Sequence, residues 1–163
     1  MYTLHCTAKL RDRLKRPLSD ARHPASTSLG DWYAAALFWK PQLALLVNER
    51  TLLPVLLPLA PVATLPERVG PAVARALERH GVARGFIERE VAAMTDIEVA
   101  KTSNRSVLGT MNEFAFEAEV YRDHRGIADL LELAVRLAET PCGAIKYRSP
   151  AGLLRELTSG THH

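Results

Sequence analysis

Three apolar runs separated by short polar turns constrain the fold of this 163-residue chain more than any other feature. The runs are residues 31–39, 43–47 and 52–57, and the turns are residues 40–42 and 48–50. Each run is apolar on both of its alternating faces, which is typical of strands covered on both sides of a sheet. Because the turns are short, we predict that the runs form an antiparallel meander.

Two prolines place the third run at an edge of this sheet. Pro54 and Pro58 lack a backbone N–H and cannot donate a hydrogen bond to a neighbouring strand. Backbone directions alternate along a strand, so positions four residues apart point to the same side. Both missing donors can therefore face away from the sheet. We predict that residues 52–57 form an edge strand, or reach the edge by Pro58.

The rest of the chain alternates between helical and extended patterns. Thr64 and Glu67 have the spacing of a capping box at the start of one helix, and Gly81 is placed to end it. The predicted order is a strand at 2–6, a helix at 8–16, the meander, helices at 65–80 and 85–94, a strand at 96–101, a helix at 104–112, a strand at 114–121, and helices at 127–139 and 150–157.

Residues 104–121 allow two interpretations. We predict a short helix at 104–112 followed by a strand at 114–121, because Gly109 and Phe116 fit a continuous helix poorly. The alternative is one long helix. Its buried stripe would be Val107, Met111, Phe114, Ala118 and Tyr121.

The composition fits a globular chain, with 47% hydrophobic and 24% charged residues. We expect one α+β domain over residues 1–158, in which a mainly antiparallel sheet of four to six strands carries helices on its faces. Residues 159–163 are expected to form a disordered tail, and His162 and His163 are interpreted as a tag remnant.

The location is predicted to be soluble and cytoplasmic, with no membrane contact. The longest apolar run, residues 52–63, is shorter than the roughly 20 residues that span a bilayer, and prolines interrupt it. The first residues lack the apolar stretch of a secretion signal. Cys6 and Cys142 show no framework spacing, so we expect two unpaired thiols.

The net charge of +3 is modest, but basic residues gather near the start of the chain. A cluster of this kind is either a solvated helix face or a patch for nucleic acid or an acidic protein. Only Asp12 and Asp20 oppose it. The cluster consists of Lys9, Arg11, Arg13, Lys15, Arg16 and Arg22.

A second polar segment is the strongest candidate binding site. It follows a predicted strand and begins a predicted helix, where backbone N–H groups and the helix dipole favour an anion. A cap is expected at Thr102 or Ser103. The alternative is a well-capped helix in which Arg105 pairs with Glu113 or Asp31. The candidate anion-binding residues are Lys101, Thr102, Ser103, Asn104, Arg105 and Ser106.

Secondary candidates are Asp31, Trp32 and Glu113. Asp31 and Glu113 could supply an acid or base, whereas Trp32 could stack on a base but fits a hydrophobic core better. Glu117 and Glu119 would lie on one face of the predicted strand, at a spacing suited to paired carboxylates. The histidines show no metal-ligand spacing, so no metal and no cofactor are expected.

Four motifs carry a resemblance to a known family. They are Leu4-His5-Cys6-Thr7, Leu29-Gly30-Asp31-Trp32-Tyr33-Ala34, Val47-Asn48-Glu49-Arg50-Thr51-Leu52, and Lys101-Thr102-Ser103-Asn104-Arg105-Ser106-Val107-Leu108-Gly109-Thr110-Met111-Asn112-Glu113. In this order they resemble an uncharacterised bacterial family catalogued as a domain of unknown function. Some members are fused to a plasmid ORF-3-like domain found near mobile elements. The resemblance covers residues 2–121 and implies no activity and no catalytic residues.

Three functional classes follow from these observations. The first is a non-enzymatic binding module for an anionic ligand, nucleic acid or an acidic protein, centred on residues 101–106 and extended by the helix at 9–16. The second is an enzyme acting on a phosphorylated or carboxylated small substrate, with Glu113 or Asp31 as acid or base. The third is a structural protein that forms a homodimer through its sheet.

Overall fold

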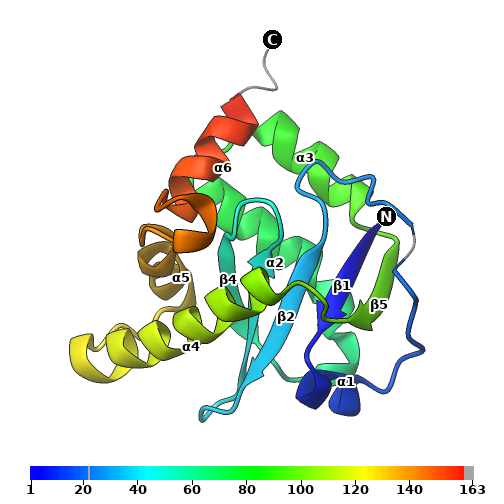
Figure 1. Ribbon diagram of the computed structural model, residues 1–163, viewed down its shortest axis with the longest axis horizontal. Coiled ribbons are helices and arrows are strands. Elements are labelled where there is room, and N and C mark those ends of the chain that lie inside the picture. Colours follow the sequence, from blue (N-terminus) through cyan, green and yellow to red (C-terminus); the bar gives the residue numbers. More distant parts are fainter. Residues whose placement is uncertain (22, 160–163) are drawn as a thin grey trace.

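A five-stranded sheet forms the centre of the computed structural model, which describes residues 1–21 and 23–159 (Figure 1). Across the sheet the strand order is β4-β3-β2-β1-β5. The strands are β1 (Tyr2–Cys6), β2 (Trp32–Leu37), β3 (Leu43–Asn48), β4 (Pro54–Pro58) and β5 (Ile97–Lys101). The α+β class and the predicted number of strands are confirmed.

The sheet is mixed rather than purely antiparallel. Strands β2, β3 and β4 form the predicted antiparallel meander, joined by short turns. Strand β1 pairs parallel with β2 on one side and with β5 on the other. The parallel pairs arise because each of two long crossovers, residues 7–31 and 59–96, returns the chain to the end of the sheet at which the preceding strand began.

Strand β4 lies at the predicted edge, and its register explains the prolines. The Asn48 N–H donates to the Leu53 carbonyl, and the same register pairs Val47 with Pro54 and Leu43 with Pro58. Hydrogen-bonded and non-hydrogen-bonded pairs alternate in an antiparallel ladder, so both prolines occupy non-hydrogen-bonded positions. Their missing donors face away from β3, as predicted.

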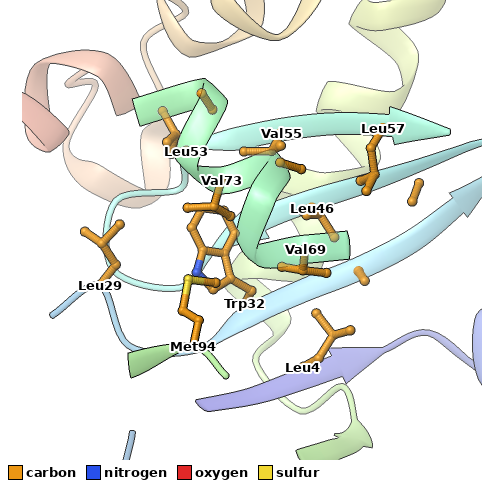
Figure 2. Close-up of a cluster of buried hydrophobic side chains, with 14 of the residues drawn as sticks. Leu4, Leu29, Trp32, Leu46, Leu53, Val55, Leu57, Val69, Val73 and Met94 are labelled. Atoms are coloured by element: carbon orange, nitrogen blue, oxygen red, sulfur yellow. The ribbon is translucent and has the colours of Figure 1, made fainter. Parts of the chain in front are cut away.

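Helices cover both faces of the sheet and enclose two hydrophobic clusters. Figure 2 shows the first cluster, in which the fully buried Trp32 lies beside Val73 and Met94. The second cluster joins Tyr33, Leu45 and Phe114 on the opposite face. The first face carries α1 (Ala8–Leu14), η1 (Val62–Thr64), α2 (Leu65–Arg79), α3 (Arg84–Ala93) and α6 (Pro150–Ser159), and the second carries α4 (Arg105–Arg125), α5 (Leu130–Ala138) and η2 (Gly143–Ile145).

The prediction of a helix followed by a strand over residues 104–121 is wrong. One helix, α4, runs through the whole segment, and Val107, Met111, Phe114 and Ala118 form its buried stripe. Its Gly109 is exposed, so the glycine leaves no gap in the core. The alternation that favoured a strand came from Phe116, which is 68% exposed and takes no part in packing.

Several helix ends also differ from the prediction. Thr64 precedes α2 but makes no side-chain cap bond, and Glu67 pairs with Arg16 instead of closing a capping box. Helix α1 ends two residues early because Lys15 adopts a left-handed conformation. Helix α5 begins at Leu130, where the Asp129 side chain caps it. The predicted tail lies outside the described residues, apart from Ser159 at the end of α6.

The assignment of residues 1–158 to a single domain stays a prediction. In the part of the chain that the structure describes, no helix is long and apolar enough to cross a membrane.

Leu45 tests the central position of β3. Its side chain is fully buried in the second cluster, so we expect Leu45→Ala to lower the free energy of unfolding by about 2–5 kcal/mol through lost transfer energy and a cavity. Chemical denaturation measures this change. The matched control is Leu18→Ala, which removes a 47% exposed side chain and should cost less than about 0.5 kcal/mol. Equal effects of the two variants would contradict the packing.

Candidate functional site

The carboxyl ends of β1 and β5 form a crevice at one edge of the sheet. These strands are parallel neighbours, and Cys6 at the end of β1 lies in register with Lys101 at the end of β5. The chain leaves β1 for α1, which packs on the first cluster, and leaves β5 for α4, which packs on the second. Parallel strands whose chains depart to opposite faces leave a crevice beyond their carboxyl ends, the usual ligand position in open α/β sheets.

His5 lies buried at the base of this crevice. Its Nδ1 is 3.0 Å from the carbonyl oxygen of Lys101, and its Nε2 is 3.1 Å from Oδ2 of Asp31. Its ring stacks on Tyr33 with centroids 4.6 Å apart. Both nitrogens face acceptors, so the imidazole satisfies both only when it carries two protons. The imidazolium is therefore the form in which both ring N–H groups find an acceptor.

Opposing influences act on the pKa of His5, and the net pKa is raised. Burial disfavours the charged ring and lowers the pKa. The hydrogen bonds to Asp31 and to the Lys101 carbonyl, with the charges of Asp31 and Glu49, outweigh burial. These contacts favour the protonated ring, and through them His5 ties β1 to the end of β5 and to the segment before β2.

Asp31 and Tyr33 extend the contacts of His5 across the site. Asp31 Oδ1 accepts the Thr3 N–H at 2.9 Å, while its own N–H donates to Glu49 Oε1 at 2.9 Å. The Tyr33 hydroxyl accepts the Asn104 N–H at 3.1 Å and lies 3.4 Å from Ser103 Oγ. The network therefore holds the backbone of residues 101–104 against the sheet.

Asn104, rather than Thr102 or Ser103, caps α4. Its Oδ1 accepts the N–H groups of Ser106 and Val107 at 2.9 and 3.2 Å. These donors, which an anion could have used, are therefore satisfied within the chain. The cationic side chains are then the main groups available to a ligand here.

Of the six predicted residues of this segment, Lys101, Thr102 and Ser103 line the crevice, and the other three follow at the start of α4. Thr102 is half-buried and the other five are exposed. Within residues 1–21 and 23–159, neither Lys101 nor Arg105 forms an ion pair, and the alternative pairing of Arg105 with Asp31 or Glu113 is not formed. A depression of about 360 Å³ opens beside Lys101 and is lined by His5 and by residues 18–21 and 100–103.

The secondary candidates are scattered. Trp32 is fully buried in the first cluster, whereas His5 faces the other side of the sheet with Tyr33. Glu113 is exposed on α4, two turns beyond Arg105. The paired arrangement of Glu117 and Glu119 on a strand is wrong, because residues two apart on a helix do not face each other. Burial and the neighbouring Glu113 charge raise the pKa of Glu117.

His5 and Tyr33 are the site residues that sequence reasoning missed. The strand register brings these residues together: His5 lies opposite Tyr33 across the parallel β1–β2 pair and beside Ala100 in β5. That pairing depends on which strand neighbours β1, and local patterns do not contain it. In the described part of the chain, no three histidine, cysteine or acidic side chains come together as metal ligands.

Comparison with known proteins places the chain in a family. A family model described as "Domain of unknown function (DUF6933)" matches residues 3–153. The chain belongs to this family. Neither the curated proteins nor the solved structures contain a match. The family resemblance noted in the sequence is confirmed, and the match also covers the segment beyond residue 127, where no resemblance was recognised.

The raised pKa of His5 makes stability depend on pH. A group whose pKa is higher in the folded than in the unfolded chain stabilises the fold when it is protonated. This contribution is complete below the unfolded pKa, about 6.5 for histidine, and is lost as the pH rises through the folded pKa. We therefore expect the free energy of unfolding to decline from about pH 6 upward more steeply in the wild type than in His5→Gln. Denaturant titrations at several pH values measure the slopes. His124→Gln, which alters an exposed histidine, should keep the wild-type slope.

The two thiols are expected to react only after unfolding. Cys6 and Cys142 are buried and free. Burial raises the pKa of Cys6 to about 12, despite the nearby Arg11, and burial with the charges of Glu113 and Glu117 raises the pKa of Cys142 to about 11. Since the thiolate is the nucleophile, iodoacetamide should modify the native protein slowly. Mass spectrometry of the denatured chain should show both alkylated without reductant; a chain lighter by a pair of hydrogens and unalkylated would contradict this.

Proposed function

We propose that this chain is a non-enzymatic binding module for an anionic ligand, which it holds at the crevice beyond β1 and β5. One observation carries the proposal. The parallel pairing of β1 with β5 places two basic segments, residues 9–16 and 101–105, at the same end of the sheet. In the sequence these segments are more than eighty residues apart.

Most of the cations at this end form no ion pair with a described residue, although Asp12 and Asp20 lie in the same region. Lys9, Lys101 and Arg105 are exposed and form no ion pair with a described residue. Arg11 and Arg13 bond to neutral oxygens, the Cys6 carbonyl and the Gln42 amide, and so keep their charge. Like charges held close together raise the local potential and attract anions.

The geometry of His5 argues against the enzyme alternative. A general base needs an unprotonated nitrogen with a free lone pair, and both nitrogens of His5 face acceptors within the protein. Both oxygens of Asp31 also accept hydrogen bonds, from Thr3 and from His5. These groups position the backbone of residues 101–104 and leave ligand contact to the side chains above it.

The sheet edges argue against a homodimer formed by strand pairing. At the β5 edge the Ser19 N–H already donates to the Val99 carbonyl. At the β4 edge, Pro54 and Pro58 flank Leu56, so that edge presents few donors to another strand. A second copy would find little to pair with on either side.

Arg105 tests the proposal. If its guanidinium binds an external anion, Arg105→Ala should weaken the binding of inorganic pyrophosphate about ten-fold while the free energy of unfolding changes by less than about 0.5 kcal/mol. Calorimetric titration and denaturation measure the two effects. The matched control is Arg84→Ala, which removes an exposed arginine of α3. A large loss of stability without any pyrophosphate binding by the wild type would leave residues 101–106 a structural motif.

A further inference from the structure

We propose that the anionic ligand is a single-stranded nucleic acid, which lies along the sheet end from Arg105 to Phe38. This inference rests on the proposed function and names its ligand class. It concerns a surface that we call the basic edge. The basic edge consists of Lys9, Arg11, Arg13, Phe38, Lys40, Lys101 and Arg105.

The basic edge spans the ends of three neighbouring parallel strands, of which β2 continues to Leu37, three residues beyond the level of Cys6. Cys6 of β1 lies in register with Lys101 of β5 on one side and with Ala34 of β2 on the other. Adjacent strands are about 5 Å apart, so β5 and β2 are separated by only about 10 Å. In Figure 1 the arrowheads of β1, β2 and β5 point to one end of the molecule, where α1 also lies.

Direct contacts join α1 to the end of β2. The Lys9 ammonium lies 5.6 Å from the centroid of the Phe38 ring. Arg13 donates to the amide oxygen of Gln42, across the turn that follows Phe38. Arg11 donates to the Cys6 carbonyl. Because that acceptor is neutral, the guanidinium keeps its positive charge at the junction of β1 and α1. A cationic row thus leads from Arg105 to an aromatic ring.

Phe38 is the feature that separates a nucleic acid from other anions. Phe38 is 51% exposed, although it immediately follows the mostly buried strand β2 and has the buried Leu37 as its neighbour. A half-exposed ring next to a cation offers one nucleotide both of its contacts, a stacking surface for the base and an ammonium for the phosphate. A small anion or an acidic peptide would use the cations and leave the ring unused.

An unpaired strand fits this surface better than a duplex. Stacking on Phe38 requires an open base face, and the bases of a duplex are stacked on each other. Among the described helices, α1 and α4 begin at the basic edge. Helix α1 has only seven residues and packs through Leu10 and Leu14, and the longer α4 packs along the second cluster through Val107, Met111 and Phe114, so neither projects to enter a major groove. We therefore expect single strands to be preferred without strong dependence on sequence.

The test is a fluorescence anisotropy titration of labelled oligothymidylate and oligouridylate at low salt. Phe38→Ala should weaken binding about ten-fold, as expected for one stacked base, and Phe38→Trp should preserve it. Phe116→Ala, which removes a ring 68% exposed on α4, is the matched control and should have no effect. Arg105→Ala should lower the slope of log affinity against log salt by about 0.7.

Heparin and polyglutamate, titrated against the same variants, separate this inference from the proposed function. If Arg105→Ala weakens heparin binding but Phe38→Ala leaves oligonucleotide binding unchanged, the nucleic-acid inference is overturned and anion binding stands. Tighter binding of duplex DNA, or equal affinity for polyglutamate, also overturns it. If wild-type protein binds neither pyrophosphate, nor heparin, nor oligonucleotides, both proposals fail. Preference for oligothymidylate or for oligouridylate identifies the source of the strand as DNA or RNA.

Discussion

The charged contacts of His5 hold together the part of the molecule on which the proposed function depends. One imidazole joins the middle of the sheet to the Lys101 carbonyl after β5 and to the Asp31 carboxylate before β2. A buried cation is stable only when its donors are met by acceptors, and here both are met. Removing either partner would leave the other without a match. The contacts therefore fix the strand ends in one relative position.

The position of α4 follows from the same network. The Tyr33 hydroxyl, in the ring stacked on His5, accepts the N–H of Asn104, and Asn104 in turn caps the first turn of α4. The helix that closes the second cluster thus begins at a point set by the sheet. The exposed cations Lys101 and Arg105 flank this fixed segment, so their charge is held at the crevice with little additional cost in chain entropy.

Local patterns in the sequence were sufficient for the meander and its edge but not for α4. Pro54 and Pro58 carry a backbone constraint that acts at any position, so their placement at an edge followed directly. Phe116 and Gly109 led to a wrong prediction because intrinsic helix propensity is a weak influence. Burial of Val107 and Phe114 in the core stabilises the helix instead. The role of His5 could not be predicted for a different reason. It arises only because β1 lies between β2 and β5, and the order of strands in a sheet is a property of the tertiary structure.

The order of the strands also gathers basic residues at one end of a weakly basic chain. A net charge of +3 spread over 163 residues would carry little information about a partner. The charges become informative because parallel strands deliver their carboxyl ends to one side, bringing α1 and the start of α4 together there. Asp12 and Asp20 lie among these cations at the surface, whereas Asp31 lies beneath them and meets His5. The His5–Asp31 pair is thus used for structure, while Lys9, Lys101 and Arg105 are exposed and form no ion pair with a described residue.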